Sequence, residues 1–244
     1  MSAQLQLFES RDPAERWTVR VSRRARRMSV RVYPGGRVEV VVPPGVPPTT
    51  VQRFVGTHSQ WISRRVEDLS AVGVPLSSGP PTSIHAQAIG RTFRIEYEYT
   101  RSTSIRPQLF SDDVLKIFGP IHDQAAIASA LRQWLSDLAY DELGAQLAAV
   151  ARELGFSFSR IQIRRQRTRW GSCSATGTIS LNVCLMFLDP AVVRYLFIHE
   201  LCHTRHMNHS PRFWALVERH EPDYRRLDRE LLKGWQAVPA WMFE

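Results

Sequence analysis

The amino-terminal part of the chain alternates apolar and polar residues, as strands do when one of their faces is buried. The alternation runs through WTVRV (17–21), SVRVY (29–33) and RVEVVV (37–42). Pro34, Gly35 and Gly36 form a turn signal between the last two segments, which predicts a hairpin. The side chains expected in its core are Trp17, Val19, Val21, Val30, Val32, Val38, Val40 and Val42.

Helical spacing replaces this alternation after the proline-rich stretch PPGVPP (43–48). Thr49 or Thr50 can cap a helix that we expect to run to Leu69. Its apolar side is expected to hold Val51, Phe54, Val55, Trp61 and Ile62. Residues 70–87 are rich in Ser, Pro and Gly and therefore predict a linker or long loop.

The remainder of the chain mixes strand and helix patterns. Strands are predicted at 92–99, 113–119, 160–164 and 178–183, with a loop at 169–177. A long helix is predicted from Gln124 to Leu154, with Gly155 as its stop, and Asp189-Pro190 opens another helix. These elements predict an α+β fold with a β-rich module carrying one helix over 1–120 and a second domain over 121–244.

Composition narrows the class of protein. The chain has 244 residues, 43% of them hydrophobic and 23% charged, which is ordinary for a globular protein. No apolar run approaches the roughly 20 residues of a membrane-spanning helix, and no basic segment followed by an apolar one marks a secretory signal. Three sparse cysteines fit a reducing compartment. We therefore expect a cytoplasmic protein without a membrane partner.

The charge of the chain points to anionic partners. A formal net charge of +9 and a pI near 10.2 favour attraction to nucleic acid, nucleotides or acidic protein surfaces. Two arginine clusters carry much of this expectation, although either could also be an ordinary solvated face. They are Arg23, Arg24, Arg26 and Arg27, and Arg164, Arg165, Arg167 and Arg169.

The strongest chemical signal is the segment His199-Glu200-Leu201-Cys202-His203. On a helix, residues four apart project from the same face, so His199 and His203 can occupy two corners of a zinc tetrahedron. Glu200 lies about 100° further round the helix. It is therefore placed to act as a base on a water at the metal, not as a ligand.

A third protein ligand is expected, because catalytic zinc usually has three protein ligands and one water. His209 is the first candidate, with His206 and Glu218 as alternatives. For His209 to reach the metal, the chain must turn back after the helix. Position 206 is a histidine where related motifs usually have glycine, so another residue must make the turn, for example Asn208 at positive φ. A structural zinc site is a second possibility, with Cys173, Cys184 and Cys202 as ligands. Because these cysteines form no C-x-x-C pair, we expect them to be buried thiols instead.

Several segments together resemble one known family. RWGSCSATGTISLN (169–182), IHELCH (198–203) and NHSPRFW (208–214) resemble the YgjP-like predicted metal-dependent hydrolases, which are relatives of the SprT-like and WLM metalloproteases. SRRARRMSVRVYPGGRVEVVVP (22–43) and QWISRR (60–65) resemble the leading module of that family. The similarity spans nearly the whole chain and is weakest over about 66–120.

The resemblance implies a minimal zincin-like domain over 121–244, built around the active-site helix. It implies an edge strand at Thr178–Val183 that pairs with an extended peptide, with the loop containing Trp170 beside it. The expected substrate-binding residues are then Trp170, Ile179, Leu181 and Asn182. Phe213 and Trp214 are expected to serve packing.

Three functions remain open at this point. The first is a zinc peptidase with Glu200 as general base and a peptide or protein substrate. The second is a metal-dependent nucleoside triphosphate pyrophosphatase, an activity also associated with YgjP-like proteins, although the sequence has no P-loop motif. The third is a nucleic-acid-binding protein with a structural zinc, against which the intact set of His199, Glu200, His203 and His209 argues.

Overall fold

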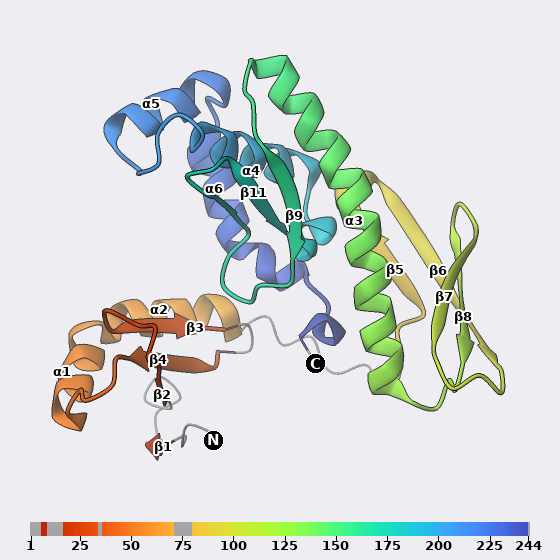
Figure 1. Ribbon diagram of the computed structural model, residues 1–244, viewed down its shortest axis with the longest axis horizontal. Helices are drawn as coiled ribbons and strands as arrows, with labels where there is room; N and C mark the ends of the chain where they lie inside the picture. The colour runs from red at the N-terminus through yellow and green to blue at the C-terminus, as the bar shows by residue number, and fades with distance from the viewer. Residues whose placement is uncertain (1–5, 9–16, 34–35, 71–79, 244) are drawn as a thin grey trace. The chain divides into compact units, whose positions relative to one another are not determined.

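The structure is a computed structural model, and it describes residues 6–8, 17–33, 36–70 and 80–243 (Figure 1). The chain forms two compact units, Met1–Gly73 and Val74–Glu244. This division differs from the boundary expected at residue 120. It does so because the strands of the second sheet contact the long helix and the 3-10 turn near the metal motif, and so belong to the second unit. The mixed α+β class is confirmed.

The first unit is built on a four-stranded sheet in the order β1-β2-β4-β3. Its strands are Gln6–Phe8 (β1), Trp17–Val21 (β2), Ser29–Val32 (β3) and Val38–Val42 (β4). The predicted hairpin is confirmed, since β3 and β4 pair antiparallel. Most of the expected core is buried, but Val19 and Val30 are half-buried and Val21 is 46% exposed, because it ends its strand.

Two helices cover this sheet where one was expected. They are Pro48–Thr57 (α1) and Ser59–Ser70 (α2), and His58 caps the first and separates them. The first helix begins at Pro48, one residue before the predicted cap, because proline is favoured at the first helical position. Val51, Val55 and Ile62 are buried as expected, whereas Trp61 is 52% exposed.

The second unit contains a sheet in the order β5-β6-β8-β7. Arg91–Tyr99 (β6) and Val114–Gly119 (β8) match the prediction, and Ser83–Ala86 (β5) and Arg106–Ser111 (β7) were not foreseen. A 3-10 turn, Gln87–Ile89 (η2), follows β5. Part of the expected linker is thus a strand, in which Ile84 and Ala86 are buried and the residues beside them are exposed. Residues 71–79 of that linker lie outside the described residues.

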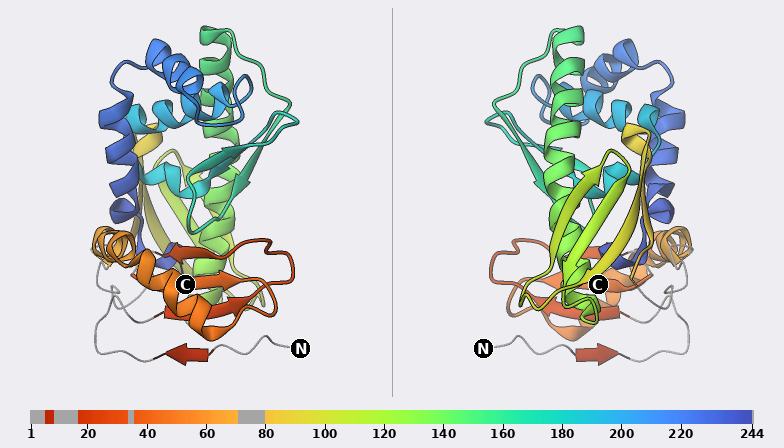
Figure 2. Two further views of the ribbon diagram at one scale, coloured as in Figure 1. Left: turned by 90° about the vertical axis from the view of Figure 1, so that its left-hand side faces the viewer. Right: turned by 90° about the vertical axis from the view of Figure 1, so that its right-hand side faces the viewer.

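The long helix Gln124–Leu154 (α3) has the predicted bounds. The Asp123 side chain accepts a hydrogen bond from the Ala126 amide (2.9 Å), and Gly155 closes the helix at φ 68°. Figures 1 and 2 show α3 between β5–β8 and the smaller sheet that contains β9. Contacts on both sides bury a row along the helix that includes Leu131, Leu135, Leu143 and Leu147.

The remaining elements follow α3 and surround the metal motif. They are Arg160–Arg164 (β9), Gly171–Cys173 (β10), Thr178–Asn182 (β11), Val183–Phe187 (η3), Pro190–Cys202 (α4), Pro211–His220 (α5), Tyr224–Lys233 (α6), Gly234–Ala237 (η4) and Ala240–Met242 (η5). Within the described part of the chain, no helix is both long and apolar enough to span a membrane.

The buried row of α3 should dominate the stability of the second unit. Leu143→Ala is expected to lower the free energy of unfolding by about 2–5 kcal/mol, because it removes fully buried methyl groups and leaves a cavity. Tyr140→Ala, at an exposed position of the same helix, should change it by less than about 0.5 kcal/mol. Urea unfolding followed by circular dichroism measures both, and equal effects would contradict the packing described.

Candidate metal centre

A three-stranded sheet forms one wall of the site, in the order β10-β11-β9. β11 pairs antiparallel with β10 and parallel with β9. The expectation of an unpaired edge at Thr178–Val183 is therefore wrong. Gly171–Cys173 was expected in a loop, but it is extended, pairs with Ile179–Leu181, and is itself an edge strand of this sheet.

The four residues expected to bind substrate lie inside the protein instead. Ile179 and Leu181 have no exposed surface, and the Trp170 ring stacks on Trp235 at 4.0 Å between centroids. The Asn182 amide donates to the backbone oxygens of Gln166 (2.6 Å) and Arg169 (2.7 Å). All four are buried and support β10 and the segment that leads into it, so they offer almost no surface to a ligand.

Helix α4 presents the metal motif. Asp189 caps it by accepting from the Ala191 amide (2.8 Å), and Pro190 is its first residue, as predicted. Apolar residues bury most of its circumference, so the polar residues of the motif are held in the interior. Glu200 and His203 are both buried, and the rings of His199 and His203 lie 5.1 Å apart between centroids.

The chain then turns back without glycine and without a left-handed residue. The amide of Thr204 donates to the Leu201 oxygen, and those of Arg205 and His206 donate to the Cys202 oxygen, so α4 ends in a tightened turn. The expectation that Asn208 takes a positive φ is wrong, since every described residue with positive φ is a glycine. This turn brings His209 back towards the helix.

The three predicted histidines come together. One ring nitrogen each of His199, His203 and His209 lies within 4.8 Å of the others, and the Nε2 atoms of His199 and His209 are 3.1 Å apart. His206 contributes only its backbone oxygen, 3.0 Å from Nδ1 of His203, a contact that orients the His203 ring. The other alternative ligand, Glu218, is not part of this cluster, and its Oε1 lies 3.9 Å from Nη2 of Arg225. Among the described residues, this set could hold a metal ion, and it contains no cysteine.

Aromatic rings support the three imidazoles. Phe213 is fully buried and lies 4.4 Å from the ring of His203, 5.0 Å from that of His199 and 4.8 Å from that of His209. Trp214 stacks on His209 at 5.5 Å. Both residues were expected to serve packing, and the rings that they pack against are those of the candidate metal ligands.

Burial sets the protonation of the site. It lowers the pKa of His199 to about 3, helped by the charges of His203 and His209, and it lowers the pKa of His203 as well. Neutral imidazoles are the form that binds metal. Burial also raises the pKa of Glu200 to about 8, against the opposing charge of Arg169. The pKa shift and the burial mark Glu200 as a group whose charge needs a partner in the site.

The backbone of β10 passes directly over Glu200. A Cβ atom built on Gly171 would lie 2.7 Å from Oε1 of Glu200, so only glycine leaves room for the carboxylate. Oε2 of Glu200 is buried and has no hydrogen-bond partner among the described residues. Sequence reasoning missed Gly171, although the WGSC motif contained it.

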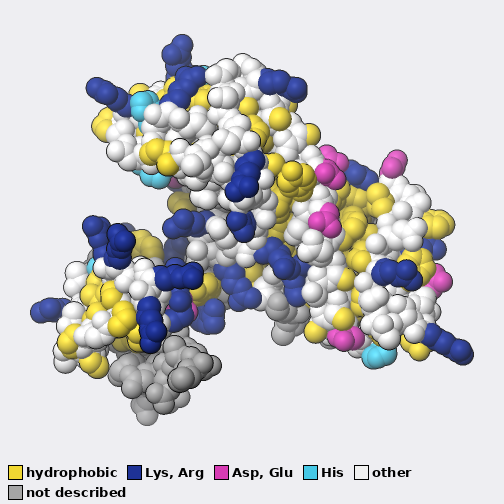
Figure 3. Space-filling view, viewed as in Figure 1, with side chains coloured by type: hydrophobic (Ala, Val, Ile, Leu, Met, Phe, Trp, Pro, Cys, Tyr) yellow, Lys and Arg dark blue, Asp and Glu magenta, His cyan; other side chains and the backbone are white. Residues whose placement is uncertain are grey.

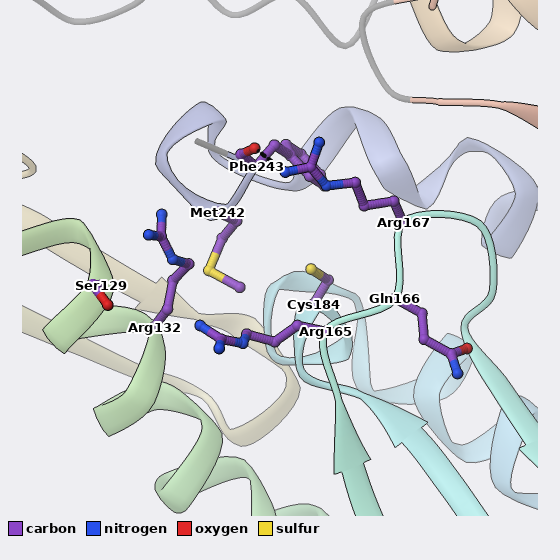
Figure 4. A pocket seen from close by; sticks show the side chains of 8 residues that line it. All are labelled: Ser129, Arg132, Arg165, Gln166, Arg167, Cys184, Met242 and Phe243. Carbon is purple, nitrogen blue, oxygen red and sulfur yellow. Dashed lines mark hydrogen bonds between the residues drawn. The ribbon is translucent and has the colours of Figure 1, made fainter. Parts of the chain in front are cut away.

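The arginines of the 164–169 cluster do not converge on the metal centre. Arg165 and Arg167 line a hollow of about 330 Å³ with Arg132 of α3 (Figure 4). Arg132 and Arg167 donate to the backbone oxygens of Trp241 and Phe243, so they hold the carboxy-terminal segment. Of the cluster, Arg169 alone contributes to the charge felt by Glu200.

Most of the net positive charge lies in the first unit. Residues 17–70 contain ten arginines, no lysine and three acidic residues, a net charge of +7. Figure 3 shows these arginine side chains, in dark blue, spread over the visible face of this unit. The four arginines of residues 23–27 are all exposed and form no ion pair within the described part of the chain. Binding of nucleic acid there stays a prediction.

This chain is similar to one solved structure and to one family model. The crystal structure of the metallopeptidase zymogen of Pyrococcus abyssi abylysin is 28% identical and covers 36% of this chain and 90% of its own, with a TM-score of 0.33. The comparison with curated proteins gives no match. A family model described as YgjP-like, metallopeptidase domain matches residues 26–233. The match spans most of the chain, including β3 and β4 of the first unit and the histidine cluster, and the chain therefore belongs to the YgjP-like metallopeptidase family.

Proposed function

We propose that this chain is a zinc-dependent peptidase in which His199, His203 and His209 hold the metal and Glu200 is the general base. One observation carries the proposal. Three imidazole nitrogens that could share one ion include that of His199, the neighbour of Glu200 in the chain, and the buried Oε2 of Glu200 has no hydrogen-bond partner among the described residues. An unsatisfied buried carboxylate is costly, and at a functional site it indicates a group that ligand or water completes.

The donor set fits zinc. Three neutral histidines with a fourth position left open are the pattern of catalytic zinc, whereas magnesium and calcium prefer oxygen ligands. When bound, zinc would polarise a peptide carbonyl and lower the pKa of a water towards about 7.

Glu200 performs the proton transfers in this scheme. Its Oε2 accepts a proton from the attacking water as the water oxygen bonds to the carbonyl carbon. The same oxygen then gives that proton to the amine nitrogen as the C–N bond breaks. Burial under β10 keeps the carboxylate away from bulk water and raises its pKa above that of an exposed glutamate, and the positive charge of a bound zinc ion would favour the ionised form that acts as a base.

The edge of β10 is the surface we assign to the peptide. Its residues Gly171–Cys173 pair with β11 on one side, which leaves backbone groups of the other side to bind an extended substrate. Gly171 lies over Glu200, so a peptide on this edge would have its backbone beside the base and the imidazoles. This replaces the expected pairing with β11.

Removing the base should abolish turnover and leave the metal bound. Glu200→Gln is expected to lower the hydrolysis of a casein mixture by at least about 100-fold, the usual contribution of general-base catalysis, at unchanged zinc content. Glu218→Gln, an exposed carboxylate on α5, is the control and should keep full activity. Release of pyrophosphate from nucleoside triphosphates that depends on Glu200, without proteolysis, would contradict the proposal.

Ligand identity can be tested by zinc content after dialysis. His209→Ala should lose most of its zinc, because a ring nitrogen of the cluster is removed. His206→Ala should retain it, since His206 meets His203 only through its backbone oxygen. The reverse pattern would show that the third ligand is assigned wrongly.

The close approach of Gly171 to the Glu200 carboxylate can be tested by adding one methyl group at position 171. Gly171→Ala should displace the Glu200 carboxylate and lower kcat by about 100-fold, because small misplacements of a catalytic group have effects of this size. Zinc content should stay unchanged. Ser172→Ala, the next residue of β10, should keep its activity, and an equal loss in both variants would argue against the contact between Gly171 and Glu200.

A further inference from the structure

A groove of about 480 Å³ is lined by residues of three segments, one of which leads on from the metal-binding helix. One side is formed by Thr204, Arg205 and Met207, which follow the candidate ligand His203. The other sides are the loop 155–159 after α3 and the turn 174–177 that joins β10 to β11. The groove therefore lies between the end of the edge strand and the end of the metal-binding helix.

Arg205 is held in place in this groove. Its guanidinium lies 4.4 Å from the ring centroid of Phe156, and Nη2 donates to the backbone oxygen of Gly155 (2.8 Å). A guanidinium has five N–H donors, so these contacts fix its plane and leave other donors unused. Arg205 is exposed and forms no ion pair in the part of the chain that the structure describes.

The rest of the groove offers no competing charge. Its lining residues include no Asp or Glu and no second cation. Several of its hydroxyls are occupied by the fold. Ser159 Oγ donates to the Thr176 oxygen, Ser174 Oγ accepts from the Thr178 amide, and Thr204 Oγ1 donates to the Leu201 oxygen. The guanidinium of Arg205 is thus the charged group that a ligand in the groove would meet.

The end of β10 leads into this groove. The strand ends at Cys173, and the turn that begins at Ser174 lines the groove. Strand residues advance by about 3.3 Å, so a peptide beside Gly171–Cys173 reaches the turn within three or four residues of the position over Glu200. A side chain of such a peptide could there enter the groove that Arg205 lines.

We propose that this groove is a specificity subsite in which Arg205 binds an Asp or Glu side chain of the peptide substrate, a few residues from the cleaved bond. The inference rests on the proposed peptidase function. A carboxylate can accept two parallel hydrogen bonds from a guanidinium, which gives charge recognition with fixed geometry. A Lys or Arg side chain in the same place would meet a like charge.

The test uses fluorogenic peptides that differ at a single position, which carries Glu, Gln or Lys and is scanned over four residues on each side of the cleaved bond. Wild type is expected to prefer Glu over Gln by about tenfold in kcat/KM at one position, the ratio that one hydrogen-bonded charge pair supplies. Arg205→Glu should reverse the order at that position so that Lys is preferred. Arg229→Glu, the same charge change at an exposed site of α6 outside the groove, should keep the wild-type order.

The possible outcomes distinguish a failure of the proposed subsite from a failure of the proposed peptidase function. Cleavage at equal rates for Glu and Lys, or a Glu preference that survives in Arg205→Glu, would overturn the subsite and leave the peptidase standing. If zinc-loaded wild type cleaves none of the peptides, the proposed function fails. The subsite is then tested by fluorescence anisotropy, which measures binding of the Glu peptide to Glu200→Gln and to the double variant Glu200→Gln/Arg205→Glu. Weaker binding to the double variant would support the subsite, and unchanged binding would reject it.

Discussion

The site depends on a close approach between the backbone of Gly171 and the carboxylate of Glu200, with no room for a Cβ between them. This contact joins the edge strand β10 to helix α4. It places the surface that we assign to the peptide within reach of the base, and the helix carries His199 and His203 on the adjoining face. Shifting either element would separate the base from the strand or from the imidazoles.

The surroundings of this contact are organised to hold buried polar groups. Phe213 contacts all three imidazoles, and the His206 oxygen fixes the ring of His203. Asn182 ties down the backbone on the way into β10. Burial of polar groups opposes folding unless they find partners, and burial keeps the histidines neutral, which is the form that binds a metal ion.

Local sequence signals foretold much of this structure. The bounds of α3, the start of α4 and the three histidines follow from periodicity, capping and motif spacing, all of which act within a few residues. Features that depend on contacts between distant parts of the chain were not predicted. β10 is too short to show alternation and is extended because it pairs with β11, so the unpaired edge was expected in the wrong strand. β5 and β7 depend in the same way on their partners β6 and β8.

X-ray absorption spectroscopy at the zinc edge of the zinc-loaded protein tests the central claim most directly, because it reports the atoms bound to the metal. The account predicts three imidazole nitrogens at about 2.0–2.1 Å and one further light atom, with the imidazole signal reduced in His209→Ala. A sulfur neighbour at about 2.3 Å would contradict it, since it would bring a cysteine such as Cys173 into the coordination of the metal.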